Sequence, residues 1–381
     1  MKKSIALTLV LTLFTSLFTI LVLPVGAVSK TIFVPDDYPT ISSAIGNATS
    51  GDVIFVKKGI YEEQTLEINK TLSIIGEDVN DTRILLHPPV YNETWILSSV
   101  YATLSNAITI NANNFRLLNL TILLKPDGYI SITGDNNTVI GSNVLSGGSV
   151  SGLIINGSYC NVTDNMLDGF ISSNGKFNSI VGNSAFNILV GGESGVIGNN
   201  TIRQIILSNT SRSFIYKNQI GSPFRFYDGL SALAREDSGI IIEGNSFDNT
   251  FSSNDVAAYT YNVKMDNRSE NNIFYQNNFE NNSRGVGILS TNFNFWDNGV
   301  KGNYWEDYTG ADANEDGIGD TPYVIDANNL DRYPLISPWM GNLPKEEFTL
   351  PQTVIVIFVV IFLILAAVLI VYLKKRHQGH S

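Results

Sequence analysis

Soft metal ligands are scarce in this chain of 381 residues. It holds one cysteine, Cys160, and three histidines, of which His377 and His380 stand in the last five residues. A single cysteine excludes an intrachain disulfide and any metal site built from several thiolates. Copper and zinc sites favour cysteine, histidine and methionine, so the body of the chain offers few ligands to such metals. We expect Cys160 to be a small buried hydrophobic residue.

Positive charge is also scarce. The chain has 24 Lys and Arg against 35 Asp and Glu, which leaves a formal net charge of −11. A surface that binds duplex DNA or RNA needs a basic patch, and the body of this sequence contains none. We therefore expect no nucleic-acid partner.

Asparagine, in contrast, recurs in seven short segments that read as an apolar residue, two spacers, asparagine, one spacer and an apolar residue. The asparagines are Asn143, Asn165, Asn183, Asn200, Asn218, Asn245 and Asn277. Successive members lie 17 to 32 residues apart, a spacing typical of stacked repeats. Asparagine suits a tight turn, and stacked asparagine side chains can hydrogen-bond from coil to coil. We predict an all-β parallel β-helix, a solenoid in which these residues form a structural ladder.

The chain from about residue 30 reads as the beginning of this solenoid. Short apolar segments at 31–34 and 53–56 predict strands. Between them, apolar residues at helical spacing after Thr40 predict an amphipathic helix over 40–48. Because a solenoid exposes its core at each end, we expect this helix to cap the N-terminal end.

Both ends of the chain read as membrane-related segments. Residues 1–27 combine a basic start, an apolar run and small residues, which predicts a secretory signal peptide, with an uncleaved anchor as the alternative. Residues 354–373 are long and apolar enough to form one transmembrane α-helix, and a buried core helix is the alternative. The basic residues in the tail 374–381 favour a cytoplasmic C-terminus. We therefore expect an extracellular ectodomain in the cell membrane, joined to a single-pass helix by a linker at 341–353.

Sequons agree with that location. Twelve asparagines head an Asn-x-Ser/Thr triplet, the acceptor pattern of a secreted glycoprotein. A chain rich in asparagine and threonine forms many such triplets by chance.

Two groups of residues carry a resemblance to known families. Residues 34–41 (VPDDYPTI) and the following Gly-Asp and Gly-Ile-Tyr phrases resemble the N-terminal motif of pectin-lyase-like right-handed β-helix proteins. The phrases NFWDN at 294–298, GNYWEDY at 302–308, DGIGDTPY at 316–323 and DRYPL at 331–335 are similar to the C-terminal motif of NosD-like β-helix proteins.

This resemblance covers about residues 30–340. It implies a right-handed, single-stranded parallel β-helix at 30–300 and a C-terminal cap at 301–340. The family's founding role is in copper-site maturation of nitrous oxide reductase, although the motifs recur in many surface proteins. The scarcity of soft ligands argues against direct copper handling by this chain.

A loop within the expected cap has the spacing of a calcium site. The oxygen-bearing residues at loop positions one, three, five, seven and nine are Asp312, Asn314, Asp316, Ile318 (through its carbonyl) and Asp320. Gly317 stands at position six, where the turn needs glycine, but Tyr323 replaces the usual glutamate at position twelve. We predict a structural Ca²⁺ ion here, with a polar turn loop as the alternative.

Aromatic residues gather around this loop: Trp296, Tyr304, Trp305, Tyr308, Tyr323, Tyr333 and Trp339. They could stack against sugars. The interpretation that we favour is that they close the open end of the core, because aromatic side chains bury large apolar areas.

Catalytic residues are not evident. Glycoside hydrolysis needs paired carboxylates, and the repeats place Asn, Ser, Thr and Gly where such enzymes place acids. A charged interruption at 222–238 supplies weak candidates, and a solvated loop is the alternative interpretation of it. The candidates are Arg225, Asp228, Arg235 and Asp237.

These observations favour a membrane-anchored extracellular module that binds glycans or serves a structural or adhesive role. A polysaccharide or cell-surface glycan is the expected partner. The alternatives are a polysaccharide lyase or hydrolase, and a NosD-like accessory factor in copper-site maturation.

Overall fold

The structure is a computed structural model that describes residues 29–88, 94–97, 100–103, 105–125, 128–146, 151–221, 238–257, 260–280, 284–288 and 292–340. The chain divides into two units, Met1–Trp339 and Met340–Ser381, and all but one of the described residues belong to the first. The expected signal peptide, linker, transmembrane helix and cytoplasmic tail lie outside the described residues. Within these ranges, the structure contains no helix of the length and apolarity that a membrane span requires.

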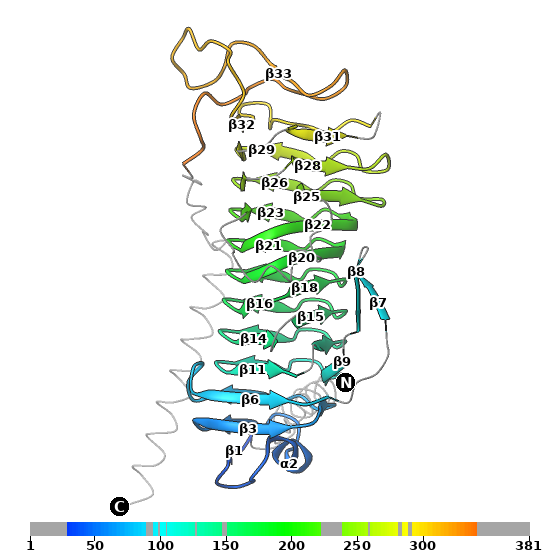
Figure 1. Ribbon diagram of the computed structural model, residues 1–381, viewed down its shortest axis with the longest axis vertical. Helices are drawn as coiled ribbons and strands as arrows, with labels where there is room; N and C mark the ends of the chain where they lie inside the picture. The colour runs from blue at the N-terminus through cyan, green and yellow to red at the C-terminus, as the bar shows by residue number, and fades with distance from the viewer. Residues whose placement is uncertain are drawn as a thin grey trace, which may run out of the picture. The chain divides into compact units, whose positions relative to one another are not determined.

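The first unit is a stack of coils, and each full coil contributes up to three short strands that pair in parallel with the coils before and after it (Figure 1). One strand per coil belongs to an eleven-stranded sheet, here called sheet A. Its strands are β1 (Thr31–Val34), β2 (Val53–Val56), β5 (Ser73–Gly76), β10 (Arg116–Leu118), β13 (Thr138–Ile140), β16 (Asn161–Thr163), β19 (Ser179–Val181), β21 (Val196–Gly198), β23 (Phe214–Tyr216), β26 (Thr250–Ser252) and β29 (Ile273–Tyr275).

The other two strands of each coil belong to a nineteen-stranded sheet, sheet B, in which they form two rows. The first row follows sheet A in each coil: β3 (Gly59–Glu63), β6 (Thr82–Leu86), β11 (Thr121–Leu124), β14 (Asn143–Ser146), β17 (Met166–Leu167), β24 (Gln219–Gly221), β27 (Asp255–Ala257), β30 (Asn278–Glu280) and β32 (Tyr304–Trp305). The second row is β4 (Leu66–Ile68), β9 (Ser105–Ile110), β12 (Gly128–Ile132), β15 (Ser151–Ile155), β18 (Phe170–Ser173), β25 (Ser238–Glu243), β28 (Tyr261–Met265) and β31 (Val286–Ile288). Two long strands span both rows: β20 (Ser184–Glu193) and β22 (Thr201–Ser211).

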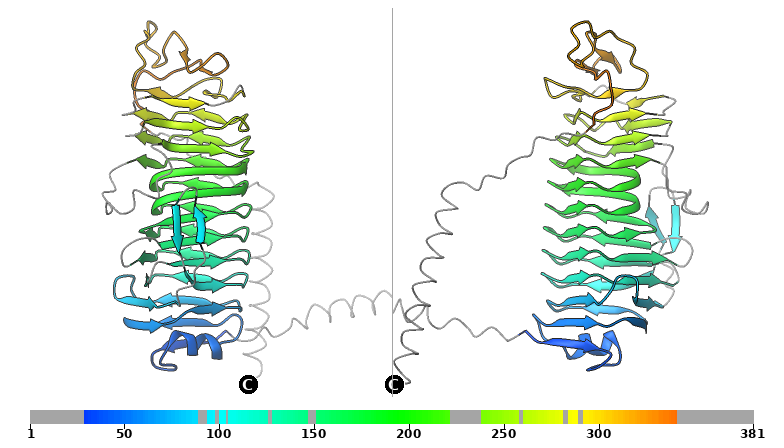
Figure 2. Two further views of the ribbon diagram at one scale, coloured as in Figure 1. Left: turned by 45° about the vertical axis from the view of Figure 1, so that its right-hand side comes forward. Right: turned by 90° about the vertical axis from the view of Figure 1, so that its left-hand side faces the viewer.

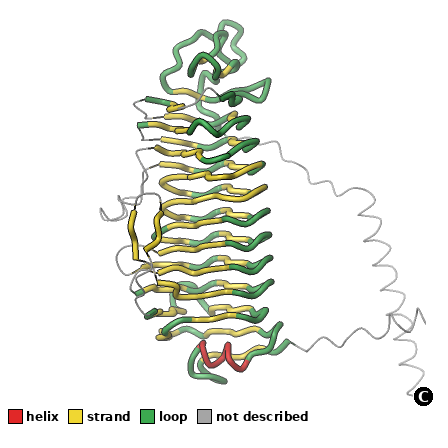
Figure 3. Tube along the Cα trace, turned by 90° about the vertical axis from the view of Figure 1, so that its right-hand side faces the viewer, coloured by secondary structure: helices red, strands yellow, loops and turns green. Residues whose placement is uncertain are grey.

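Two antiparallel hairpins depart from the stack. Strands β7 (Thr94–Leu97) and β8 (Val100–Thr103), which lie between β6 and β9 in the sequence, pair with each other beside the stack (Figure 2). Strands β33 (Tyr323–Val324) and β34 (Leu330–Asp331) pair near its C-terminal end. The tube view shows the coils as successive layers of strand joined by turns (Figure 3). The parallel β-helix predicted from the repeats is therefore confirmed, while its right-handed sense stays a prediction.

The core is a column of apolar side chains inside the coils. In sheet A each middle residue points inward, so that Val139, Val162, Ile180, Ile197 and Ile215 align in register. Each of them is at most 1% exposed. A β-strand alternates its side chains between two faces, which explains how a three-residue strand buries only its central residue. Stacking joins these single buried residues into one continuous core.

The helix expected near the N-terminus is present as α2 (Ile41–Asn47). Thr40 is its N-cap and forms a capping box with Ser43. The side chains of Ile41 and Ala44 are fully buried in the core. Its role as a cap over the first coils stays a prediction.

Candidate functional site

A column of buried asparagines follows sheet A, as the repeats predict. Its members are Asn165, Asn183, Asn200, Asn218, Asn254, Asn277 and Asn303. From Asn183 onward, each Oδ1 accepts hydrogen bonds from the backbone N–H and the Nδ2 of the member one coil earlier, at 2.8–3.1 Å. Each Nδ2 also donates to a backbone carbonyl of an earlier coil, as Asn183 does to Val162 at 2.8 Å. The turn's polar groups are thereby satisfied inside the stack.

Two of the seven predicted ladder residues are wrong. In the coil of Asn143 the column position is Ser142, whose backbone N–H donates to Asn165. Asn245 follows β25 of sheet B, so it lies in a different turn and is exposed. The member in that coil is Asn254, whose neighbours Phe251 and Val256 fit the same apolar pattern, so the pattern alone does not distinguish Asn254 from Asn245. The other five predicted residues lie in the column.

A second asparagine column, not predicted from the sequence, precedes sheet A. Its asparagines include Asn249, Asn272 and Asn294. The Oδ1 atoms of Asn272 and Asn294 each accept the backbone N–H and the Nδ2 of the preceding asparagine at 3.0–3.1 Å. Cys160 and Ser213 occupy the position in other coils. Most members lie five residues before a member of the first column, as in the pairs 178/183, 249/254 and 272/277, whereas Asn294 lies nine residues before Asn303. That repeated five-residue spacing was the signal that could have found it.

Both columns end on one segment of the C-terminal cap, residues 329–331. Asn329 Oδ1 accepts the backbone N–H of Asn294 at 3.0 Å and the indole N–H of Trp296 at 3.4 Å. Asp331 Oδ2 accepts the backbone N–H of Asn303 at 2.7 Å and the indole N–H of Trp305 at 2.9 Å. Each column therefore terminates on an acceptor that also holds a tryptophan. This explains why tryptophan, asparagine and aspartate recur in the C-terminal motif.

The aromatic residues of the cap close the core. Trp296 and Trp305 are 0% and 2% exposed. Trp296 stacks on Phe274 with ring centroids 4.4 Å apart, and Trp305 stacks on Tyr323 at 4.3 Å. Burial of such large rings contributes apolar area where the repeats end. The geometry of these residues agrees with the capping interpretation.

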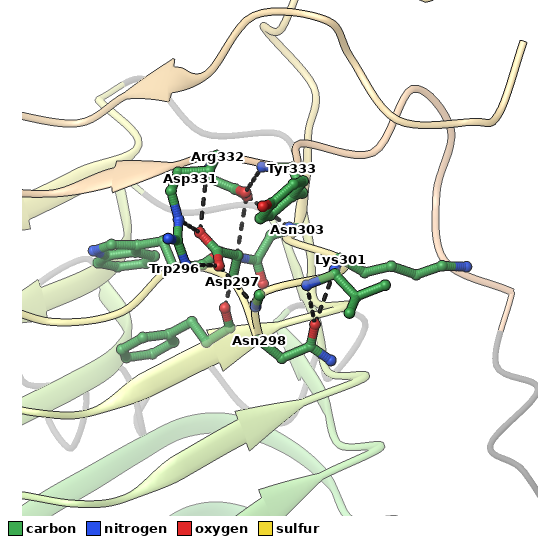
Figure 4. Close-up of polar contacts among 11 residues, drawn as sticks. Trp296, Asp297, Asn298, Lys301, Asn303, Asp331, Arg332 and Tyr333 are labelled. Carbon is green, nitrogen blue, oxygen red and sulfur yellow. Dashed lines mark hydrogen bonds and ion pairs between the residues drawn. The ribbon is translucent and has the colours of Figure 1, made fainter. Parts of the chain in front are cut away.

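Two buried carboxylates in the cap differ in charge environment. Asp297 forms an ion pair with Arg332, with Oδ1 and Nη2 2.5 Å apart (Figure 4). Burial alone would raise the pKa of Asp297, but hydrogen bonds from Arg332 and from the Gly299 backbone outweigh it and lower the pKa. Burial raises the pKa of Asp331 to about 6, although N–H groups of Asn303, Trp305 and Tyr333 favour its charged form.

We expect the Asp331→Asn variant to change the pH dependence of stability. Asp331 has a higher pKa in the folded chain than its ordinary 3.8, so its stabilising contribution is complete below about pH 4 and is lost as pH rises through about 6. The two pKa values differ by an amount that corresponds to about 3 kcal/mol. We therefore expect the free energy of unfolding of the wild type, relative to that of Asp331→Asn, to fall by up to that amount between pH 4 and pH 7. The measurement is urea unfolding of the two proteins across this range. A difference that stays constant with pH would contradict the assignment.

The predicted calcium ligands lie in one loop: Asp312, Asn314, Asp316, Ile318 and Asp320. The Asp312 carboxylate accepts backbone N–H groups of Asp316 and Gly317 at 3.1 and 2.9 Å, and Asp320 accepts that of Ala313 at 2.8 Å. Among the described residues, no group of three or more His, Cys, Asp or Glu side chains is placed to hold a metal ion. Calcium binding at this loop stays a prediction of the sequence.

The weak catalytic candidates cannot be placed. Arg225, Asp228, Arg235 and Asp237 all lie outside the described residues. They belong to a connection between the first and second rows of sheet B, between β24 and β25. The lyase or hydrolase alternative therefore depends on residues with no described geometry.

An exposed ladder of neutral side chains runs along one turn of the stack, after the second row of sheet B. It is called the amide edge here, and it consists of Asn69, Asn111, Thr133, Asn156 and Asn174. Asn111 Nδ2 donates to Asn69 Oδ1 at 3.2 Å, and Thr133 Oγ1 donates to Asn111 Oδ1 at 2.8 Å. Asn174 Nδ2 donates to Asn156 Oδ1 at 2.9 Å. One hydrogen-bonding side chain per coil thus faces solvent at a regular spacing of about 4.8 Å.

Comparisons with known proteins place this stack beside the NosD family. The profile of the family described as "NosD: Periplasmic copper-binding protein (NosD)" matches residues 172–310. Two relatives are each called "Probable ABC transporter binding protein NosD": that of Stutzerimonas stutzeri is 34% identical over 107 residues, and that of Pseudomonas aeruginosa is 31% identical over 106. Each match covers 27% of this chain and 24% of the relative, so the chain spans about a quarter of their length.

Among solved structures, the crystal structure of pectate lyase Pel9A is similar with a TM-score of 0.40 and 15% identity. That similarity covers 72% of this chain and 76% of the lyase chain. A pectin methylesterase in complex with hexasaccharide VII has a TM-score of 0.25 at 16% identity, over 63% of this chain and 79% of the esterase chain.

Copper, which the family description names, does not fit the described residues. Cys160 is 1% exposed, its Sγ lies 3.6 Å from the carbonyl oxygens of Gly134 and Ser158, and burial raises the pKa of its thiol. Met265 is buried in the core. His87 is the one histidine within the described ranges. A copper site needs several soft ligands at one place, and the part of the chain that the structure describes does not bring them together.

Proposed function

We propose that this chain, a NosD-like parallel β-helix protein, acts outside the cytoplasm as a binding module for polysaccharide. The observation that carries the proposal is the amide edge. Its neutral donors and acceptors repeat once per coil, and the coil spacing is close to the length of one sugar unit in an extended polysaccharide. A rigid stack holds these groups in place before a ligand arrives, which reduces the entropy lost on binding. Anchorage by residues 354–373 and an extracellular location are parts of the same proposal.

Binding without catalysis is favoured by what two buried carboxylates and one half-buried carboxylate do. Asp297 is paired with Arg332, and Asp331 ends an asparagine column. Asp168 accepts hydrogen bonds from the Ser146 backbone at 2.7 Å and from Ser151 Oγ at 2.5 Å. These three acids serve the stack itself. Glycoside hydrolysis requires two carboxyl groups that flank the scissile bond and are free to exchange protons with the substrate.

The experiment is to incubate the purified full chain with soluble glucan, mannan and galacturonan. We expect saturable binding of at least one of them by isothermal titration calorimetry. Reducing ends and ultraviolet absorbance of unsaturated products should stay at the level of a heat-denatured control. Release of either product would favour the lyase or hydrolase alternative. Absence of binding to every member of the panel would refute the proposal.

A further inference from the structure

Two aromatic residues stand exposed at the turn that carries the amide edge. Tyr159 and Phe177 are 60% and 46% exposed, and their rings stack with centroids 5.0 Å apart and an interplanar angle of 13°. Each lies three residues after a member of the amide edge, Asn156 or Asn174. The rings and the amides therefore belong to the same two turns of adjacent coils.

The backbone at both rings is in a conformation that bulky residues disfavour. Tyr159 has φ of 58° and Phe177 has φ of 57°, both in the left-handed region. In two preceding coils the left-handed residue of this turn is Asn114 or Asn136, and asparagine adopts that region readily. Large rings at these positions cost backbone strain and also expose apolar area to water. Such costs at a solvent-facing turn are typical of a site kept for binding.

Three charged side chains lie at the same turn as the two exposed rings. Lys176 Nζ and Arg212 Nη1 each lie 3.0 Å from the Glu193 carboxylate. This cluster carries one net positive charge within a chain of net charge −11. The three side chains occupy the same turn in the coils of Phe177 and beyond, because the Phe177 backbone N–H donates to the Glu193 carbonyl at 2.9 Å.

We infer that Tyr159 and Phe177 form the stacking platform of a saccharide site, with Asn156 and Asn174 as its hydrogen-bonding groups. The ligand class is an oligosaccharide whose apolar ring face lies on the aromatic pair and whose hydroxyl groups meet the amides. A few placed polar groups beside aromatic rings are the usual lining of such sites. This inference rests on the proposed function and names the part of the surface that performs it.

The test replaces both rings by the residue that the same turn uses elsewhere. The wild type and the full-length double variant Tyr159→Asn/Phe177→Asn are made in a host without N-glycosylation, because Asn156 heads a sequon and the change at 177 creates another. Binding of glucan, mannan and galacturonan hexasaccharides is measured by calorimetry, together with the melting temperature. We expect at least tenfold weaker binding with a melting temperature that is unchanged or higher, since asparagine relieves the backbone strain.

Two matched variants and one further measurement sharpen the result. Phe293→Asn removes another ring, 60% exposed, from a coil nearer the C-terminal end and should leave affinity within twofold. Tyr159→Phe keeps the stack and should also bind. If the wild type binds but the double variant binds equally well, the platform is refuted while the proposed function stands. If no hexasaccharide or polymer binds the wild type, both fail. A lowered melting temperature, or a change from dimer to monomer by light scattering, would assign the rings to folding or self-association and overturn the inference.

Discussion

Gly157→Ala should strongly destabilise the protein. A Cβ atom at position 157 would lie 1.8 Å from the carbonyl oxygen of Gly134 in the preceding coil. Gly175 stands in the same relation to Gly157, with 1.9 Å between its added Cβ and the Gly157 oxygen. The atoms in conflict are backbone atoms held by the parallel ladder, so a rotamer change cannot relieve them. We expect a loss of about 3 kcal/mol or more in the free energy of unfolding, measured by urea denaturation.

Gly46→Ala is the matched control for that substitution. Gly46 lies in helix α2, and an added Cβ would meet no heavy atom within 4 Å. Alanine loses less conformational entropy than glycine on forming a helix, so this variant should gain about 0.5–1 kcal/mol. If Gly157→Ala unfolds at the same urea concentration as the wild type, the coils do not approach one another as closely as described.

Asn218→Leu should cost a comparable amount for a different reason. Asn218 is fully buried, and its Oδ1 accepts the Asn200 backbone N–H at 3.0 Å while its Nδ2 donates to the Ile197 carbonyl at 3.0 Å. Leucine fills similar space but leaves those backbone groups buried without partners. Each such group costs about 1–3 kcal/mol, so we expect a total loss of about 3–5 kcal/mol. The measurement is the urea midpoint and slope of the full chain.

Asn245→Ala tests whether stability depends on the buried column or on the sequence pattern that predicted it. Asn245 fits the same apolar pattern in the sequence as Asn218, but it is exposed and lies outside the column. Its replacement should change the free energy of unfolding by no more than about 0.5 kcal/mol. Equal losses for Asn218→Leu and Asn245→Ala would show that the motif, and not the buried column, determines stability.

The repeat pattern predicted the stack because the same local requirement recurs in every coil. Asn165, Asn183, Asn200, Asn218 and Asn277 follow a short strand whose central residue is buried, and this arrangement produces the apolar spacing visible in the sequence. The pattern failed at Asn245 because strands of sheet B show the same alternation as strands of sheet A. The apolar spacing indicates which residues of a strand are buried. It does not indicate which of the three strands of a coil a segment forms.

Features that depend on contacts between distant residues were beyond the sequence pattern. The partnership of Asp331 with Asn303 and Trp305 spans 26 to 28 residues and arises only when the cap folds over the last coil. The stacking of Tyr159 on Phe177 depends on the height of one coil. In the cap, the spacing of oxygen-bearing residues predicts a calcium loop, and this stays a prediction; the Asp312 and Asp320 carboxylates accept backbone N–H groups of their own loop.

The termination of both asparagine columns has a consequence for self-assembly. Every coil offers its successor the same N–H and carbonyl groups, so an uncovered last coil would offer them equally to another molecule. Asn329 and Asp331 engage the column residues at that end, and the cap crosses above them. The column residues at that end are therefore not available to pair with a strand of another molecule. A fold built from one repeated layer has no intrinsic stop, so we expect this cap to oppose extension of the stack into a fibre.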